Sequence, residues 1–111
     1  DFVYLHVEAP DEAAHGGLLD EKIKAIENFD RLVVGTVIEA IDQIGDCRIL
    51  VLPDHPTPVE LRTHTSKAVP YILFDSRCDK KQRSAGYSEE SAEATGIECD
   101  GHLLLKQLLE R

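Results

Sequence analysis

Five side chains that can ligate a metal ion stand in two short parts of the sequence: Asp11, His15, Asp54, His55 and His64. The first two are four positions apart, a spacing that places two side chains on one face of a helical turn. The other three lie in and just after the proline-rich stretch PDHPTP. Carboxylate oxygens and imidazole nitrogens without a thiolate suit Mn²⁺, Zn²⁺ or Mg²⁺. The pattern therefore predicts a divalent-metal site.

The stretch PDHPTP (residues 53–58) is too rich in proline for a helix interior or a central strand. Asp54 and His55 are adjacent within this stretch, so their side chains point in different directions. They therefore suit two ions a few ångströms apart, an arrangement that clamps a phosphoryl group. Each part also has an ordinary explanation, because an acid is common at a helix start and an Asp in a turn. Thr57 is interpreted as a turn residue and Arg62 as a surface arginine.

Composition limits the class of protein. The chain has 111 residues, 42% of them apolar and 30% charged, which predicts one small domain with a modest core. The net charge of −9 argues against a nucleic-acid or anionic-membrane partner. The three cysteines form no CxxC pair, and we expect a cytoplasmic protein. Because the chain opens without Met on an apolar stretch, we expect residues 1–111 to be a fragment of a longer protein.

The first half of the chain predicts a strand and a long helix. Residues 2–8 are β-branched and aromatic, which is typical of a strand. Between residues 20 and 44 apolar side chains recur in steps of three and four, which predicts a helix. Asp20 is the predicted N-cap, Gly35 is expected to weaken the middle, and Gly45 is expected to end the helix.

The second half alternates strands and loops. Residues 47–52 form a nearly continuous apolar run, typical of a strand buried on both faces of a parallel sheet. Residues 53–68 are a predicted loop, residues 69–74 a third strand, residues 76–95 an exposed polar excursion, and residues 101–111 an amphipathic helix. This order predicts an α/β fold with helices on the faces of a layered sheet. If the first two strands are parallel, the loops that follow them meet at one sheet edge.

Four stretches together resemble the C-terminal part of archaeal-type cofactor-independent phosphoglycerate mutases, which belong to the alkaline phosphatase superfamily. The resemblance covers residues 2–75 closely and rests on HVEAPDEAAHGG, KAIENFDRLVVG, ILVLPDHPTP and RTHTSKAVPYILF. It implies a partial alkaline-phosphatase-like domain with two divalent ions, Mn²⁺ or Zn²⁺. Asp11, His15 and His64 would hold one ion, and Asp54 and His55 would hold part of the second.

The chain departs from the family pattern because the upstream Asp, the nucleophilic Ser and the substrate-binding lid are missing. We therefore expect a small phosphorylated substrate for the whole enzyme, no activity for this chain alone, and self-association through exposed apolar surface. Two alternatives stay open: a related phosphotransfer enzyme resembling homoserine kinases, and a metal-binding module without catalysis.

Overall fold

The computed structural model describes residues 1–78 and 86–110. The chain divides into two units, the first of residues 1–43 and 55–67, the second of residues 44–54 and the chain from residue 68 onward. The expectation of a single domain over residues 1–111 stays a prediction. Within the described ranges, no helix is both long enough and apolar enough to cross a membrane.

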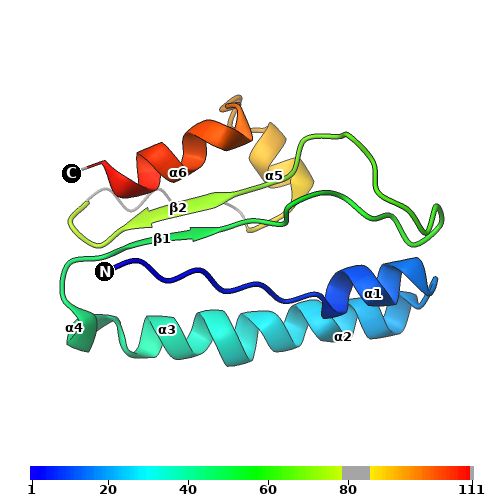
Figure 1. Cartoon of the computed structure of the whole chain (residues 1–111), viewed down its shortest axis with the longest axis horizontal. Helices are drawn as coiled ribbons and strands as arrows, with labels where there is room; N and C mark the ends of the chain where they lie inside the picture. The colour runs from blue at the N-terminus through cyan, green and yellow to red at the C-terminus, as the bar shows by residue number, and fades with distance from the viewer. Residues whose placement is uncertain (79–85, 111) are drawn as a thin grey trace. The chain divides into compact units, whose positions relative to one another are not determined.

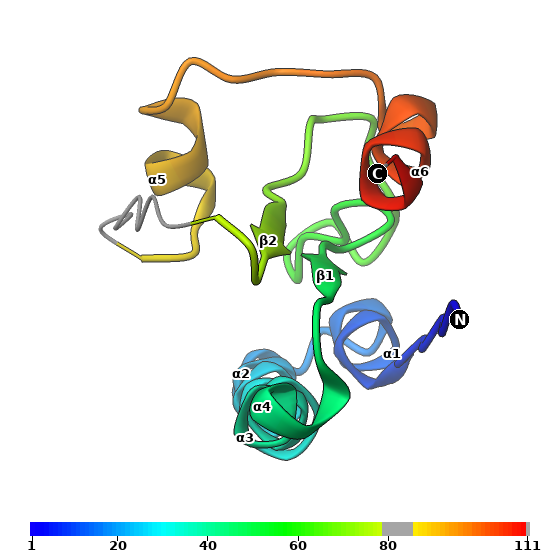
Figure 2. The same cartoon turned by 90° about the vertical axis from the view of Figure 1, so that its left-hand side faces the viewer.

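Helices dominate the first unit. In chain order the helical segments of the first half are α1 (Ala9–His15), α2 (Leu19–Phe29), the π-helical η1 (Asp30–Val34), α3 (Gly35–Glu39) and α4 (Ile41–Ile44). α1 packs against α2. The segment before α1 runs alongside the rod that α2, η1 and α3 form together (Figure 1). Figure 2 looks along this rod and shows α2 and α3 following one axis.

The start of the long helix differs from the prediction. Leu18, not Asp20, is the residue that precedes the helix, and it makes no side-chain cap. Asp20 lies instead in the first turn, where the positive end of the helix dipole stabilises its carboxylate.

The middle and end of the long helix follow the prediction more closely. The Gly35 N–H bonds to the carbonyl of Asp30, five residues back, so the expected weakening takes the form of one π-helical turn. The helix then continues to Glu39 and is interrupted at Ala40, which has a bridge-region backbone. Gly45 has φ +83°, which confirms it as the residue that stops the helix.

The predicted strand over residues 2–8 is wrong. The structure has no strand there, and within its described part no backbone hydrogen bond involves residues 2–7. Val3 and Tyr4 expose 84% and 76% of their surface. High β-propensity makes a strand only when a second strand pairs with it, because an isolated strand leaves its N–H and C=O groups to water.

The second unit contains the sheet. Strand β1 (Arg48–Val51) pairs with β2 (Ile72–Asp75), and the pairing is antiparallel, so the predicted parallel arrangement of residues 47–52 is wrong. The third predicted strand begins at Ile72, beyond Pro70, which cannot donate to a ladder. The α/β class itself is confirmed, with a small two-stranded sheet and several helices. No strand from the first unit is available to form the sheet edge that we expected.

Two short helices follow the sheet. α5 (Glu89–Glu93) begins at Ser88, whose hydroxyl accepts the Ser91 N–H, and lies inside the predicted polar excursion. Residues 79–85 of that excursion lie outside the described residues. α6 (Gly101–Leu109) confirms the last predicted helix. The Arg48 guanidinium donates to the carbonyls of Gln107 and Glu110, which ties the end of α6 to β1.

Few side chains are buried. Within the described ranges the buried residues are the apolar Ala13, Ala14, Pro70 and Leu104 and the polar Thr57. The core in the structure is therefore smaller than the composition predicts. The three buried residues of the first unit, Ala13, Ala14 and Thr57, belong to α1 and to the proline-rich loop (residues 55–67), so burial in this unit is concentrated where those two segments meet.

Candidate metal centre

Helix α1 carries the first two predicted ligands on one face. Pro10 occupies the first turn, where its missing N–H costs nothing. Asp11 and His15 then follow one turn apart, and His15 Nε2 lies 3.3 Å from Asp11 Oδ2. The spacing of four positions therefore brings the carboxylate and the imidazole together, as predicted.

A Schellman motif ends α1 directly after His15. The Leu18 N–H bonds to the Ala13 carbonyl at 2.9 Å, and the Gly17 N–H bonds to the Ala14 carbonyl at 3.0 Å. Gly17 has φ +70°, the left-handed conformation that this motif requires. The motif stops the helix one turn beyond Asp11 and holds His15 in its last turn.

The proline-rich loop brings His55 and His64 together. The Thr65 N–H bonds to the Pro56 carbonyl at 3.0 Å and closes the loop on itself. The rings of His55 and His64 stack with centroids 3.6 Å apart. Pro56 restricts the backbone next to His55, so the prolines provide a stiff frame for two imidazoles that are nine positions apart in the sequence.

The loop and α1 meet at their polar side chains. His64 Nε2 lies 3.0 Å from His15 Nε2 and 3.4 Å from Asp11 Oδ1. The four side chains Asp11, His15, His55 and His64 therefore form one cluster, which we call the imidazole cluster. All four belong to the first unit.

Arg62 fixes one ring of the imidazole cluster through its backbone. Its carbonyl lies 2.8 Å from His15 Nδ1, and a carbonyl only accepts, so His15 carries its proton on Nδ1 and presents the lone pair of Nε2 to the cluster. Arg62 has φ +52°, which is uncommon for a residue with a side chain. Sequence reasoning considered only the guanidinium of Arg62 and missed this role of its carbonyl.

Thr57 is the second residue that sequence reasoning missed. It is 5% exposed, and its hydroxyl donates to Asp11 Oδ1 at 2.6 Å. The interpretation of Thr57 as a turn residue did not include this burial or this contact with Asp11. A threonine between two prolines gives no sequence signal of burial, because the burial arises only when the loop packs against α1.

Asp11 is the electrostatic centre of the imidazole cluster. The Thr57 hydroxyl lowers the pKa of Asp11, and the nearby His15, His64 and His55 lower it further against the opposing effect of desolvation. Asp11 is therefore ionised at neutral pH and offers a carboxylate as a candidate ligand.

The donor set of the imidazole cluster fits a divalent cation. One ligand atom each from Asp11, His55 and His64 lies within 4.8 Å of the others. Imidazole nitrogen with carboxylate oxygen suits Zn²⁺ and Mn²⁺, and no thiolate takes part. Asp54 is not a member of this group. It is an exposed residue and belongs to the second unit. Assigning the five predicted residues to metal ions stays a prediction.

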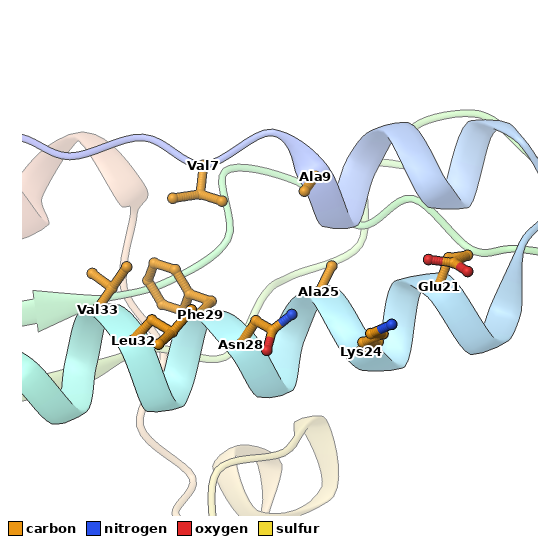
Figure 3. A pocket seen from close by; sticks show the side chains of 9 residues that line it. All are labelled: Val7, Ala9, Glu21, Lys24, Ala25, Asn28, Phe29, Leu32 and Val33. Carbon is orange, nitrogen blue, oxygen red and sulfur yellow. The ribbon is translucent and has the colours of Figure 1, made fainter.

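A separate apolar groove lies elsewhere in the first unit. Val7 faces Phe29 and Val33 across it, and Lys24 and Glu21 stand toward its other end (Figure 3). It contains no member of the imidazole cluster, and its walls offer mainly hydrocarbon. The groove is therefore not the candidate site.

Comparison with known proteins gives one family and several close relatives. A profile described as "Metalloenzyme superfamily" matches residues 1–104. A protein of Geobacter sulfurreducens named probable 2,3-bisphosphoglycerate-independent phosphoglycerate mutase is 51% identical over 112 aligned positions, which cover all of this chain and 28% of the relative. The mutase of Methanothrix thermoacetophila is 54% identical over 68% of this chain and 20% of its own length. Mutase 2 of Methanothermobacter thermautotrophicus is 55% identical over 74% of this chain and 20% of its own length.

The chain thus spans between a fifth and about three tenths of the length of these curated relatives. No solved structure matches it.

Proposed function

The chain belongs to the metalloenzyme superfamily, and on this premise we propose that residues 1–111 form the metal-binding part of a 2,3-bisphosphoglycerate-independent phosphoglycerate mutase. The reaction would interconvert 3- and 2-phosphoglycerate through a phosphoserine formed outside these residues. The observation that carries the proposal is the meeting of Asp11, His55 and His64 ligand atoms within 4.8 Å in a chain 51% identical to a relative named as a probable mutase.

The family and the donor set together indicate the use of divalent metal. We propose two ions, Mn²⁺ or Zn²⁺, with Asp11, His15 and His64 on one and Asp54 and His55 on the other. Bound divalent cations supply positive charge that neutralises the oxygens of a phosphoryl group.

The residues of this chain contribute ligand orientation. The ionised Asp11 supplies the carboxylate, and the Arg62 carbonyl keeps the His15 lone pair on Nε2, which faces the imidazole cluster. The stacked rings of His55 and His64 are held in place by the closed loop.

The substrate we propose is a small phosphorylated acid, and the location the cytoplasm. The kinase-like alternative is not carried forward, because the three relatives described above are all named as mutases. A metal module without catalysis would explain the imidazole cluster but not this shared naming.

A chimera tests the proposal. The 112 matching positions of the Geobacter sulfurreducens protein are replaced by this chain, and mutase activity is measured with Mn²⁺, beside the unaltered relative. We expect an active chimera whose activity is lost with His64→Ala and kept with His102→Ala, a histidine outside the imidazole cluster. A folded chimera without activity, beside an active relative, would refute the proposal.

We further propose that residues 1–111 self-associate through the segment 2–7. Its side chains are exposed, and within the described residues its backbone has no hydrogen-bonded partner, so a second copy of the segment can pair with it. Light scattering after size exclusion should give a mass that rises with concentration. Val3→Lys with Leu5→Lys should leave a monomer, whereas Ile97→Lys, at a position with 62% exposure in the other unit, should not. A monomer at every concentration would contradict the proposal.

A further inference from the structure

Thr57 has the contacts of a positioning residue. Its hydroxyl donates to Asp11 Oδ1 at 2.6 Å, a short bond of the kind made to an ionised carboxylate. The same oxygen lies 3.2 Å from His55 Nδ1. One buried hydroxyl thus contacts two members of the imidazole cluster, one from α1 and one from its own loop.

The single proton of the Thr57 hydroxyl determines the ring tautomer of His55. A threonine hydroxyl has one proton to donate. Because an ionised carboxylate only accepts, that proton goes to Asp11, and the oxygen is left to accept a hydrogen bond from His55 Nδ1. His55 then carries its proton on Nδ1 and its lone pair on Nε2, the form in which Nε2 is the ligating atom. The Arg62 carbonyl acts on His15 in the same way.

Helix α2 holds Thr57 in place. Lys22 Nζ donates to the Thr57 carbonyl at 2.7 Å. Pro56 and Pro58 restrict the backbone on both sides. The backbone of Thr57 is therefore located by an ion–dipole contact from α2 and by the stiffness of the loop, and from this position its hydroxyl reaches Asp11.

We propose that Thr57 is the positioning residue of the metal centre: its hydroxyl sets the orientation of the Asp11 carboxylate and the ring tautomer of His55, and Lys22 keeps it there. This inference rests on the proposed function for the identity of the ligand, but the tautomer of His55 can be measured without any metal.

The experiment compares Thr57→Val, which keeps the shape and removes the hydroxyl, with Thr57→Ser, which restores the hydroxyl. Thr65→Val is the matched control, because Thr65 lies in the same loop and its buried hydroxyl has no hydrogen-bond partner among the described residues. The ring ¹⁵N shifts of His55 are recorded for metal-free residues 1–111, and Zn²⁺ affinity is measured by calorimetry.

We expect Thr57→Val to shift His55 away from the Nδ1–H tautomer and to weaken Zn²⁺ binding by about 10- to 100-fold, the usual cost of losing a group that orients a ligand. Thr57→Ser should restore both properties, and Thr65→Val should change neither. An unchanged tautomer and affinity in Thr57→Val would overturn the inference. Weaker binding with an unchanged tautomer and no rescue by Ser would also overturn it, because that result describes a packing role.

The two proposals fail in different ways. If the unaltered chain binds no Zn²⁺ while the His55 tautomer still depends on the Thr57 hydroxyl, the positioning role stands and the metal centre does not. If Zn²⁺ binds through His64 and ignores Thr57, the metal centre stands and the positioning role does not.

Discussion

Replacing Gly17 with alanine tests whether the end of α1 positions His15. Gly17 has φ +70°, where a residue with a side chain costs about 1–2 kcal/mol. An added Cβ would also lie 2.5 Å from Arg62 Nε, so the guanidinium must move. That side chain is exposed and flexible, so most of the cost is backbone strain in the Schellman motif.

Two other glycines calibrate the free-energy cost of alanine at position 17. Gly45 has φ +83° and nothing within 4 Å of an added Cβ, so Gly45→Ala reports backbone strain alone. Gly16 has φ −71°, where alanine is favoured over glycine by about 0.5–1 kcal/mol, and its added Cβ meets only the movable side chain of Leu18 and a carbonyl. We therefore expect Gly17→Ala and Gly16→Ala to differ by about 1.5–3 kcal/mol in the free energy of opening the end of α1.

Hydrogen exchange of the Leu18 amide measures this opening, because its N–H closes the motif onto Ala13. Gly17→Ala should speed exchange there and weaken Zn²⁺ binding, since His15 is in the last turn of α1. Gly45→Ala should leave both unchanged. The reasoning is refuted if the Leu18 amide exchanges at the same rate in Gly17→Ala and Gly16→Ala.

Two further predictions concern pH and the second unit. Burial, with a smaller effect of Glu89, raises the pKa of Tyr87 from 10.0 to about 12, so its contribution to stability is complete below pH 10.0 and is lost as the pH rises to about 12; alkaline circular-dichroism titrations should show this loss, and Tyr87→Phe should lack it. Hydrogen bonds from Arg77 and then Arg48 lower the pKa of Asp75 from 3.8, so its contribution is present above that pH and lost in acid. In thermal melts at a series of pH values, Asp75→Asn should lose this part of the fall in melting temperature in acid and should melt at a lower temperature at neutral pH. An unchanged fall in acid would contradict the assignment.

Local patterns predicted the helical parts of this chain well. The spacing of Asp11 and His15 needs only one helical turn to place both on one face, and Gly45 needs only its own backbone freedom to end a helix. Such features depend on neighbours within a few positions, so the sequence contains the information.

Features that depend on distant segments were predicted poorly. Residues 2–8 have strand propensity but no partner strand in the structure, and the antiparallel direction of β1 and β2 depends on pairing that their apolar pattern does not encode. The role of Thr57 arises only when the loop packs on α1. The role of Arg62 depends on its own left-handed backbone conformation, and its carbonyl lies against His15.

Calorimetric titration of residues 1–111 with Mn²⁺ and Zn²⁺, beside His64→Ala and His102→Ala, tests the metal centre most directly. His64 Nε2 lies 3.0 Å from His15 Nε2 and 3.4 Å from Asp11 Oδ1, so its loss removes the ligand that joins the loop to α1. We predict saturable binding that His64→Ala abolishes and His102→Ala leaves intact. Absence of binding in the unaltered chain, or equal binding in both variants, would contradict the assignment of Asp11, His15 and His64 to a metal ion.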